Sequence, residues 1–70
     1  MERARITLRP KEDLRLRAGH PWVYDNEIAR VEAAPAPGDE VEIRDARGLP
    51  VGVAFFNPSS KIRARIYSRE

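Results

Sequence analysis

The chain has 70 residues, 41% of them hydrophobic, which is enough for one small core and excludes a second domain within this stretch. It contains no cysteine and a single His, which excludes a disulfide framework, a thiolate metal site and a zinc-binding set. The net charge at pH 7 is +2, from 13 basic and 11 acidic side chains, and most of the basic ones are Arg.

The charge is distributed unevenly along the chain. Residues 1–20 contain six basic and three acidic side chains, residues 21–45 contain two and seven, and residues 46–70 contain five and one. If the two basic ends lie side by side in the fold, they form a positive face of the kind that attracts phosphate backbones. A compositional bias, or ion pairs in solvent, would account for the same arginines without any partner.

The first predicted elements are a strand and a short helix. Apolar and polar residues alternate over positions 3–9, which is the period of a half-buried strand. Pro10 then opens a predicted helix over residues 10–18, with acidic side chains in its first turn and two arginines in its last. Gly19 is expected to end this helix in the left-handed conformation.

The middle of the chain predicts short extended pieces and one long loop. Residues 22–24 form a short strand, and residues 28–31 form a second short piece that is either extended or helical. The sequence Ala-Ala-Pro-Ala-Pro-Gly within residues 32–39 cannot hold a regular ladder, so we expect a surface loop there.

The last third of the chain predicts three more strands. Alternation over 40–44, a glycine turn at 45–48 and a second apolar run at 51–56 predict an antiparallel hairpin. After a polar turn at 57–60, a final strand over 61–67 would direct one face into the core and present two arginines on the other. The pattern as a whole is typical of a mainly β fold with one or two short helices, curled into a small barrel or sandwich.

The segment Gly19-His20-Pro21-Trp22-Val23-Tyr24 holds the only His and the only Trp of the chain, next to a glycine and a proline. One interpretation is structural: the glycine caps the helix, Pro21 fixes the turn and Trp22 closes one end of the core. The other is functional: Gly19 lets a nucleic-acid backbone approach closely, while His20 and the helix arginines contact phosphate or a splayed base. Both can hold at once.

No catalytic set is apparent in the sequence. Asp39, Glu40 and Glu42 have no basic or nucleophilic partner in view, so a solvated strand face is the better interpretation. Gly48 and Gly52 lack the spacing of a phosphate-binding loop. The polar run at 57–61 is typical of a plain hairpin turn.

No membrane segment is expected either. The longest uncharged stretch, Gly48–Ser60, contains two prolines and is far shorter than the roughly 20 apolar residues of a spanning helix. The first residues lead into strand alternation and not into an apolar signal region. We therefore expect a cytoplasmic protein with no membrane partner.

Three runs of the sequence match a known pattern nearly end to end. They are Leu16–Tyr24, which contains Gly-His-Pro-Trp-Val; Gly38–Val41 with Asp45–Gly48; and Gly52–Arg65, which contains Asn-Pro-Ser-Ser-Lys-Ile-Arg-Ala-Arg. In this combination they resemble the N-terminal PUA domain of the RlmI-like, S-adenosylmethionine-dependent ribosomal RNA (cytosine-5) methyltransferases.

The resemblance implies a PUA-like pseudobarrel of mixed strands over residues 1–70 that binds RNA. In such domains the RNA lies against the first helix, the glycine-containing turn after it and the nearby strands. By position, the resemblance points to Arg15, Arg17, Gly19, His20 and Trp22 as RNA-binding residues, and charge placement adds Lys61, Arg63 and Arg65.

The resemblance also implies a larger enzyme. The methyl-donor pocket and the catalytic cysteine of the family lie in another domain, so we expect these 70 residues to be catalytically silent and to hold no cofactor themselves. We expect the parent enzyme to use S-adenosylmethionine on a cytosine of large-subunit ribosomal RNA. The expected partners are that RNA and the chain's own catalytic domain.

An alternative function is packing. In that case the barrel would contact its own enzyme or a twin subunit in a homodimer, with Trp22, Phe55 or Phe56 as anchors and little RNA affinity of its own. A stand-alone enzyme is the third and weakest hypothesis, since no catalytic set is in view.

Overall fold

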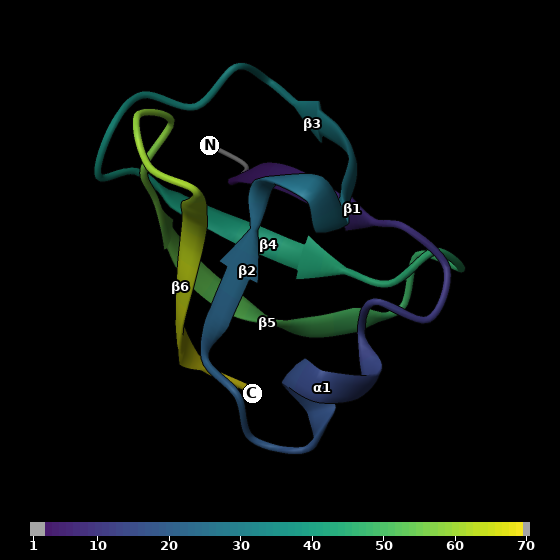
Figure 1. Ribbon diagram of the computed structural model, residues 1–70. Coiled ribbons are helices and arrows are strands. Elements are labelled where there is room, and N and C mark those ends of the chain that lie inside the picture. Colours follow the sequence, from purple (N-terminus) through teal and green to yellow (C-terminus); the bar gives the residue numbers. More distant parts are fainter. Residues whose placement is uncertain (1–2, 70) are drawn as a thin grey trace.

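The computed structural model describes residues 3–69, which form six strands and two short helical turns (Figure 1). In chain order they are β1 (Ala4–Leu8), α1 (Leu14–Arg17), β2 (Trp22–Tyr24), the 3-10 turn η1 (Asp25–Glu27), β3 (Ile28–Glu32), β4 (Glu40–Arg44), β5 (Pro50–Phe56) and β6 (Ile62–Ser68). The prediction of a mainly β fold with one or two short helices is confirmed, and the segment at 28–31 is extended.

All six strands belong to one sheet in the order β2-β6-β5-β4-β1-β3. β1 and β4 are parallel, and every other neighbouring pair is antiparallel, including the predicted β4–β5 hairpin. The sheet curls, so that β2 and β6 pass in front of β4 in Figure 1. This mixed, curled sheet agrees with the pseudobarrel of mixed strands that the resemblance implies.

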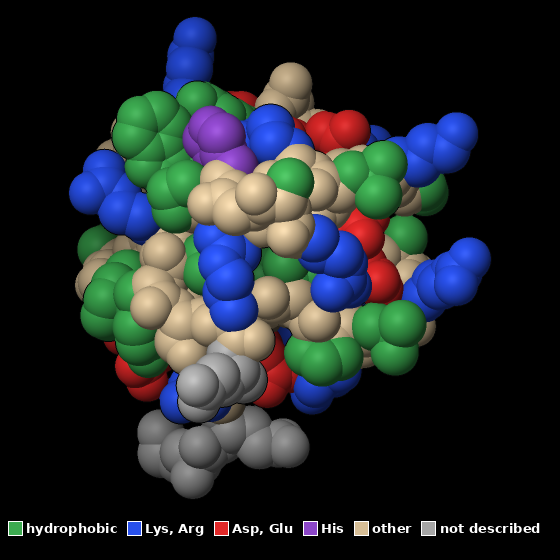
Figure 2. Space-filling view, turned by 90° about the horizontal axis from the view of Figure 1, so that it is seen from below, with side chains coloured by type: hydrophobic (Ala, Val, Ile, Leu, Met, Phe, Trp, Pro, Cys, Tyr) green, Lys and Arg blue, Asp and Glu red, His purple; other side chains and the backbone are tan. Residues whose placement is uncertain are grey.

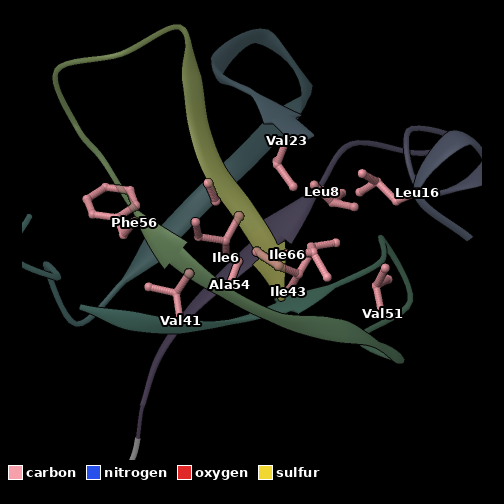
Figure 3. Close-up of a cluster of buried hydrophobic side chains, with 11 residues drawn as sticks. Ile6, Leu8, Leu16, Val23, Val41, Ile43, Val51, Ala54, Phe56 and Ile66 are labelled. Carbon is pink, nitrogen blue, oxygen red and sulfur yellow. The ribbon is translucent and has the colours of Figure 1, made fainter. Parts of the chain in front are cut away.

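The core lies inside the curl of this sheet (Figure 3). Ile6 and Leu8 from β1 and Val41 and Ile43 from β4 are completely buried, as their alternation with polar neighbours predicts. α1 contributes only Leu16, which is also completely buried. The core therefore contacts α1 through one side chain, which is enough to hold a single helical turn.

The predicted helix over 10–18 is too long, because only Leu14–Arg17 is helical. Lys11 has a φ of +70°, so the chain leaves β1 through a turn, in which Glu12 N–H donates to the carbonyl of Arg9. Residues 10–13 offer the core no apolar side chain, which removes the packing that stabilises helices in proteins. Pro10 and the acidic residues after it, which predict the start of a helix, therefore form a turn that precedes α1.

The end of α1 follows the prediction. Gly19 has a φ of +114°, its N–H donates to the carbonyl of Leu16, and His20 N–H donates to the carbonyl of Arg15. These two bonds form the Schellman arrangement that ends helices at a left-handed glycine.

β5 and β6 approach each other closely at Gly52. A Cβ added there would lie 2.7 Å from the carbonyl oxygen of Ser68 and 3.1 Å from Cγ2 of Ile66. Glycine at this position therefore permits β6 to cross β5 and continue toward α1.

We predict that Gly52→Ala lowers the free energy of unfolding by about 1–3 kcal/mol, because the new methyl group forces β6 away from β5. Urea denaturation followed by circular dichroism measures this change. Ser59→Ala, in an exposed turn, serves as the control and should stay within about 0.5 kcal/mol of wild type. An unchanged midpoint for Gly52→Ala would contradict the close packing described here.

Candidate functional site

Parts of the two basic segments, α1 from the first and the end of β6 with Arg69 from the last, meet at the turn between α1 and β2. β2 pairs with β6 so that Trp22 lies opposite Arg65, and Ile66 N–H donates to the carbonyl of Pro21 at 2.7 Å. Beyond β6, the guanidinium of Arg69 donates to the carbonyls of Leu16 at 2.8 Å and His20 at 3.2 Å. α1 and the last described residues therefore lie on the same side of the molecule (Figure 1).

The turn presents a small group of rings. Trp22 is 37% exposed, and its ring makes edge contacts with His20 at 5.7 Å and Tyr24 at 6.4 Å between centroids. The Nδ1 atom of His20 accepts a hydrogen bond from Trp22 N–H at 3.4 Å. The turn is thus ordered by its own contacts, while Trp22 stays partly exposed.

Arg15 is bound within the protein. Its guanidinium donates to both carboxylate oxygens of the buried Glu27, at 2.6 and 2.8 Å, and to the carbonyl of Trp22 at 3.1 Å. It also lies 5.3 Å from the centroid of the Tyr24 ring, a cation–π contact. Removing Arg15 would leave Glu27 buried without its cation, so this side chain positions the turn.

Arg17 is also paired. It contacts Asp13 at 2.8 Å and Asp45 at 2.9 Å, and the hydrogen bond with Asp13 raises its pKa above the usual value. Asp45 is buried, and the backbone N–H groups of Leu49 and Arg47, followed by Arg17, hold the pKa of its carboxyl below the usual 3.8. Arg17 therefore ties α1 to the β4–β5 turn.

The remaining cations of this region differ in how they are bound. Arg63 is 3.5 Å from Asp25 and donates to the carbonyl of Ser60 at 3.0 Å. Within residues 3–69, Lys61, Arg65 and Arg69 have no carboxylate partner. Arg69 lies outside the set predicted from the sequence, because only the tertiary structure shows that it reaches α1.

Figure 2 shows this side of the molecule, which faces downward in Figure 1. Basic side chains gather around the single His and beside hydrophobic groups, with acidic side chains between some of them. The face is therefore a mixture of paired and unpaired cations and not a uniformly positive patch.

The outer face of the sheet continues this surface. Arg65 lies opposite Trp22 on one side and opposite Phe55 on the other, so a cation sits between two exposed aromatic residues. Phe55 is 48% exposed and stacks on Tyr67 with 4.5 Å between ring centroids. The Tyr67 hydroxyl donates to Glu40, which lowers the pKa of Glu40 and raises that of Tyr67.

Phe56 is not available as an anchor. Its side chain is buried in the core, whereas its neighbour Phe55 faces outward. The sequence could not separate the two, because β5 is apolar on both faces. Of the three predicted anchors, only Trp22 and Phe55 reach the surface.

Two classes of feature are not found among the described residues. No helix in residues 3–69 is long and apolar enough to cross a membrane. No group of three or more His, Asp or Glu side chains in that range could hold a metal ion.

Comparison with known proteins identifies the class. Residues 6–69 match the PUA-like domain family, so the chain belongs to that family. The assignment agrees with the mixed, curled sheet and with the short helix between β1 and β2.

Relatives of this chain carry a more particular name. It is 35% identical over 65 residues to the ribosomal RNA large subunit methyltransferase I of Alteromonas mediterranea, and 36% identical over 64 residues to that of Erwinia tasmaniensis. These matches cover 93% and 91% of the chain but only 16% of each relative. The protein of the same name from Vibrio campbellii is 41% identical over 51 residues, or 73% of the chain.

We predict that the buried carboxyl of Asp45 makes the free energy of unfolding depend on pH. Because the pKa of Asp45 is lower in the folded chain than the usual 3.8, the ionised carboxyl stabilises the fold fully above that pH. This stabilisation is lost as the pH falls through the pKa of the folded state. The urea midpoint of the wild type should therefore fall more steeply below pH 4 than that of Asp45→Asn. Parallel curves for the two proteins between pH 5 and pH 2.5 would contradict this assignment.

Proposed function

We propose that this domain binds ribosomal RNA through the surface formed by the α1–β2 turn and β6. The observation that carries the proposal is that Arg65 and Arg69, which have no carboxylate partner among the described residues, lie beside the α1–β2 turn and its exposed Trp22. Lys61, which also has no carboxylate partner among the described residues, lies at the other end of β6, where its carbonyl accepts Asp25 N–H. Unpaired cations beside an exposed ring suit a phosphate backbone with unstacked bases.

Each residue of the surface has a distinct part in this proposal. Lys61, Arg65 and Arg69 contact phosphates, and Gly19, which has open space around its Cα, lets the RNA backbone approach the turn. Trp22 and His20 contact a base or sugar. Arg15, Arg17 and Arg63 hold the turn and β6 in place through their ion pairs and add positive charge at the rim.

The names of the relatives extend the proposal to a larger enzyme. They are ribosomal RNA large subunit methyltransferases, and this chain spans 16% of the length of those from Alteromonas and Erwinia. We propose that the domain presents large-subunit ribosomal RNA, in the cytoplasm, to an S-adenosylmethionine-dependent catalytic domain outside these 70 residues. The methyl transfer itself would belong to that other domain.

A second candidate function is packing against that catalytic domain or against a second copy. The exposed, stacked pair of Phe55 and Tyr67 favours it, because exposed aromatic residues are common at the centre of protein interfaces. The two functions differ in their dependence on salt, since phosphate contacts weaken with ionic strength and apolar contacts do not.

We predict that the affinity for a labelled fragment of large-subunit ribosomal RNA falls steeply as salt rises, with contributions from the unpaired cations. Arg65→Ala and Arg69→Ala should each reduce the slope of log K against log salt by roughly 0.7–0.9, the loss of about one phosphate contact. Fluorescence anisotropy at several salt concentrations measures both quantities.

Arg30→Ala is the matched control, because Arg30 is an exposed arginine on β3, at the opposite edge of the sheet, where it pairs with Glu32. It should leave the affinity and the slope close to wild type. Absence of RNA binding at low salt, together with oligomers in sedimentation velocity, would reject the proposal in favour of packing.

A further inference from the structure

A hollow of about 310 Å³ opens beside Arg65 at the end of β5. Its walls are Phe55, Phe56, Asn57, Ser60, Ile62 and Arg65. The volume is at the lower end of the range for small-molecule sites. Since Arg65 also lies opposite Trp22, the hollow continues the proposed RNA surface across β6.

One wall of the hollow is an oriented aromatic ring. Phe55 stacks on Tyr67 with an angle of 17° between the rings, and Tyr67 is in turn held by its hydrogen bond to Glu40. Tyr67 does not line the hollow, so the part of Phe55 that borders it is a different one from the part that Tyr67 covers. The ring is thus fixed in place while it remains partly exposed.

The polar wall of the hollow offers hydrogen-bond donors. The Oδ1 atom of Asn57 accepts Ser59 N–H at 3.1 Å, and its side-chain NH₂ group has no hydrogen-bond partner among residues 3–69. The Oγ atom of Ser60 accepts Ile62 N–H at 3.1 Å, and its hydroxyl proton has no acceptor among the residues that the structure describes. The guanidinium of Arg65 has no hydrogen-bond partner in the part of the chain that the structure describes.

A ligand that fits this hollow combines a flat apolar ring with acceptor oxygens and negative charge. An unpaired nucleotide has both features: its base can stack on Phe55, and its carbonyl or phosphate oxygens can accept the free donors. Paired bases stay stacked inside a duplex, where Phe55 cannot reach their faces.

We infer that this hollow binds one unpaired nucleotide, so that the domain selects single-stranded over double-stranded RNA. The inference rests on the proposed function and adds to it the kind of RNA that is bound. Strands in a sheet lie about 4.8 Å apart, which places Phe55 roughly 10 Å from Trp22 on the same face, with Arg65 between them. Two exposed rings then flank one phosphate-binding side chain.

The test compares a labelled 12-residue oligouridine with an RNA duplex of the same length, by anisotropy at low salt. Phe55→Ala should weaken binding of the single strand by roughly 5- to 100-fold, the value of one base–aromatic stack, and leave duplex binding unchanged. Phe55→Trp, which keeps a flat ring, should restore single-strand binding. Val31→Ala, which removes an exposed apolar side chain from β3, is the control and should have no effect.

The outcomes separate the two proposals. Circular dichroism first checks that Phe55→Ala and Phe55→Leu are folded. If both then bind the single strand as wild type does, the nucleotide site is overturned. If Arg65→Ala weakens binding of both RNAs in the same experiment, the proposed function stands. If wild type binds neither RNA, both fail. If Phe55→Ala changes only the oligomeric state, the hollow belongs to a protein interface and the inference is overturned.

Discussion

The pairing of β6 with β2 is the interaction on which the rest of the structure depends. β2 is only three residues long and lies at the edge of the sheet, yet its contact with β6 fixes the turn that precedes it. The same pairing carries the chain on to Arg69, whose hydrogen bonds reach the carbonyls of Leu16 and His20. Segments about 50 residues apart in the chain thereby share one surface, and Gly52 allows it by letting β6 cross close to β5.

The arginines of this surface divide into two groups by their partners. Arg15 and Arg17 bind the buried carboxylates of Glu27 and Asp45, so their charge is largely used in holding α1 and the turn. Arg65 is exposed between two rings, and Arg69 binds the neutral carbonyls of Leu16 and His20, so neither charge is neutralised by a carboxylate of residues 3–69. In the proposed RNA surface, the positive charge that is free of carboxylates among the described residues therefore comes from Arg65 and Arg69, and not from the helix arginines to which the resemblance points.

The sequence predicts the strands well because strict alternation records which side of each strand is buried. It overstates the helix, because Pro10 with two acidic residues after it is equally compatible with a turn and only the packing of Leu16 decides the length. The sequence shows that arginines are numerous, but it does not show which of them are paired. Glu27 and Asp45 are distant in sequence from the arginines that they bind, so these ion pairs form only when the chain folds. Nor could it show that Phe55 faces outward, because both faces of β5 are apolar.

Amide chemical-shift mapping of the domain during an RNA titration tests the central claim most directly. The account predicts that the signals of residues 19–24 and 61–69 shift together, with the same apparent affinity, because pairing of β2 with β6 makes them one surface. Shifts confined to β3 and the loop at 33–39, or shifts of only one of the two segments, would contradict it.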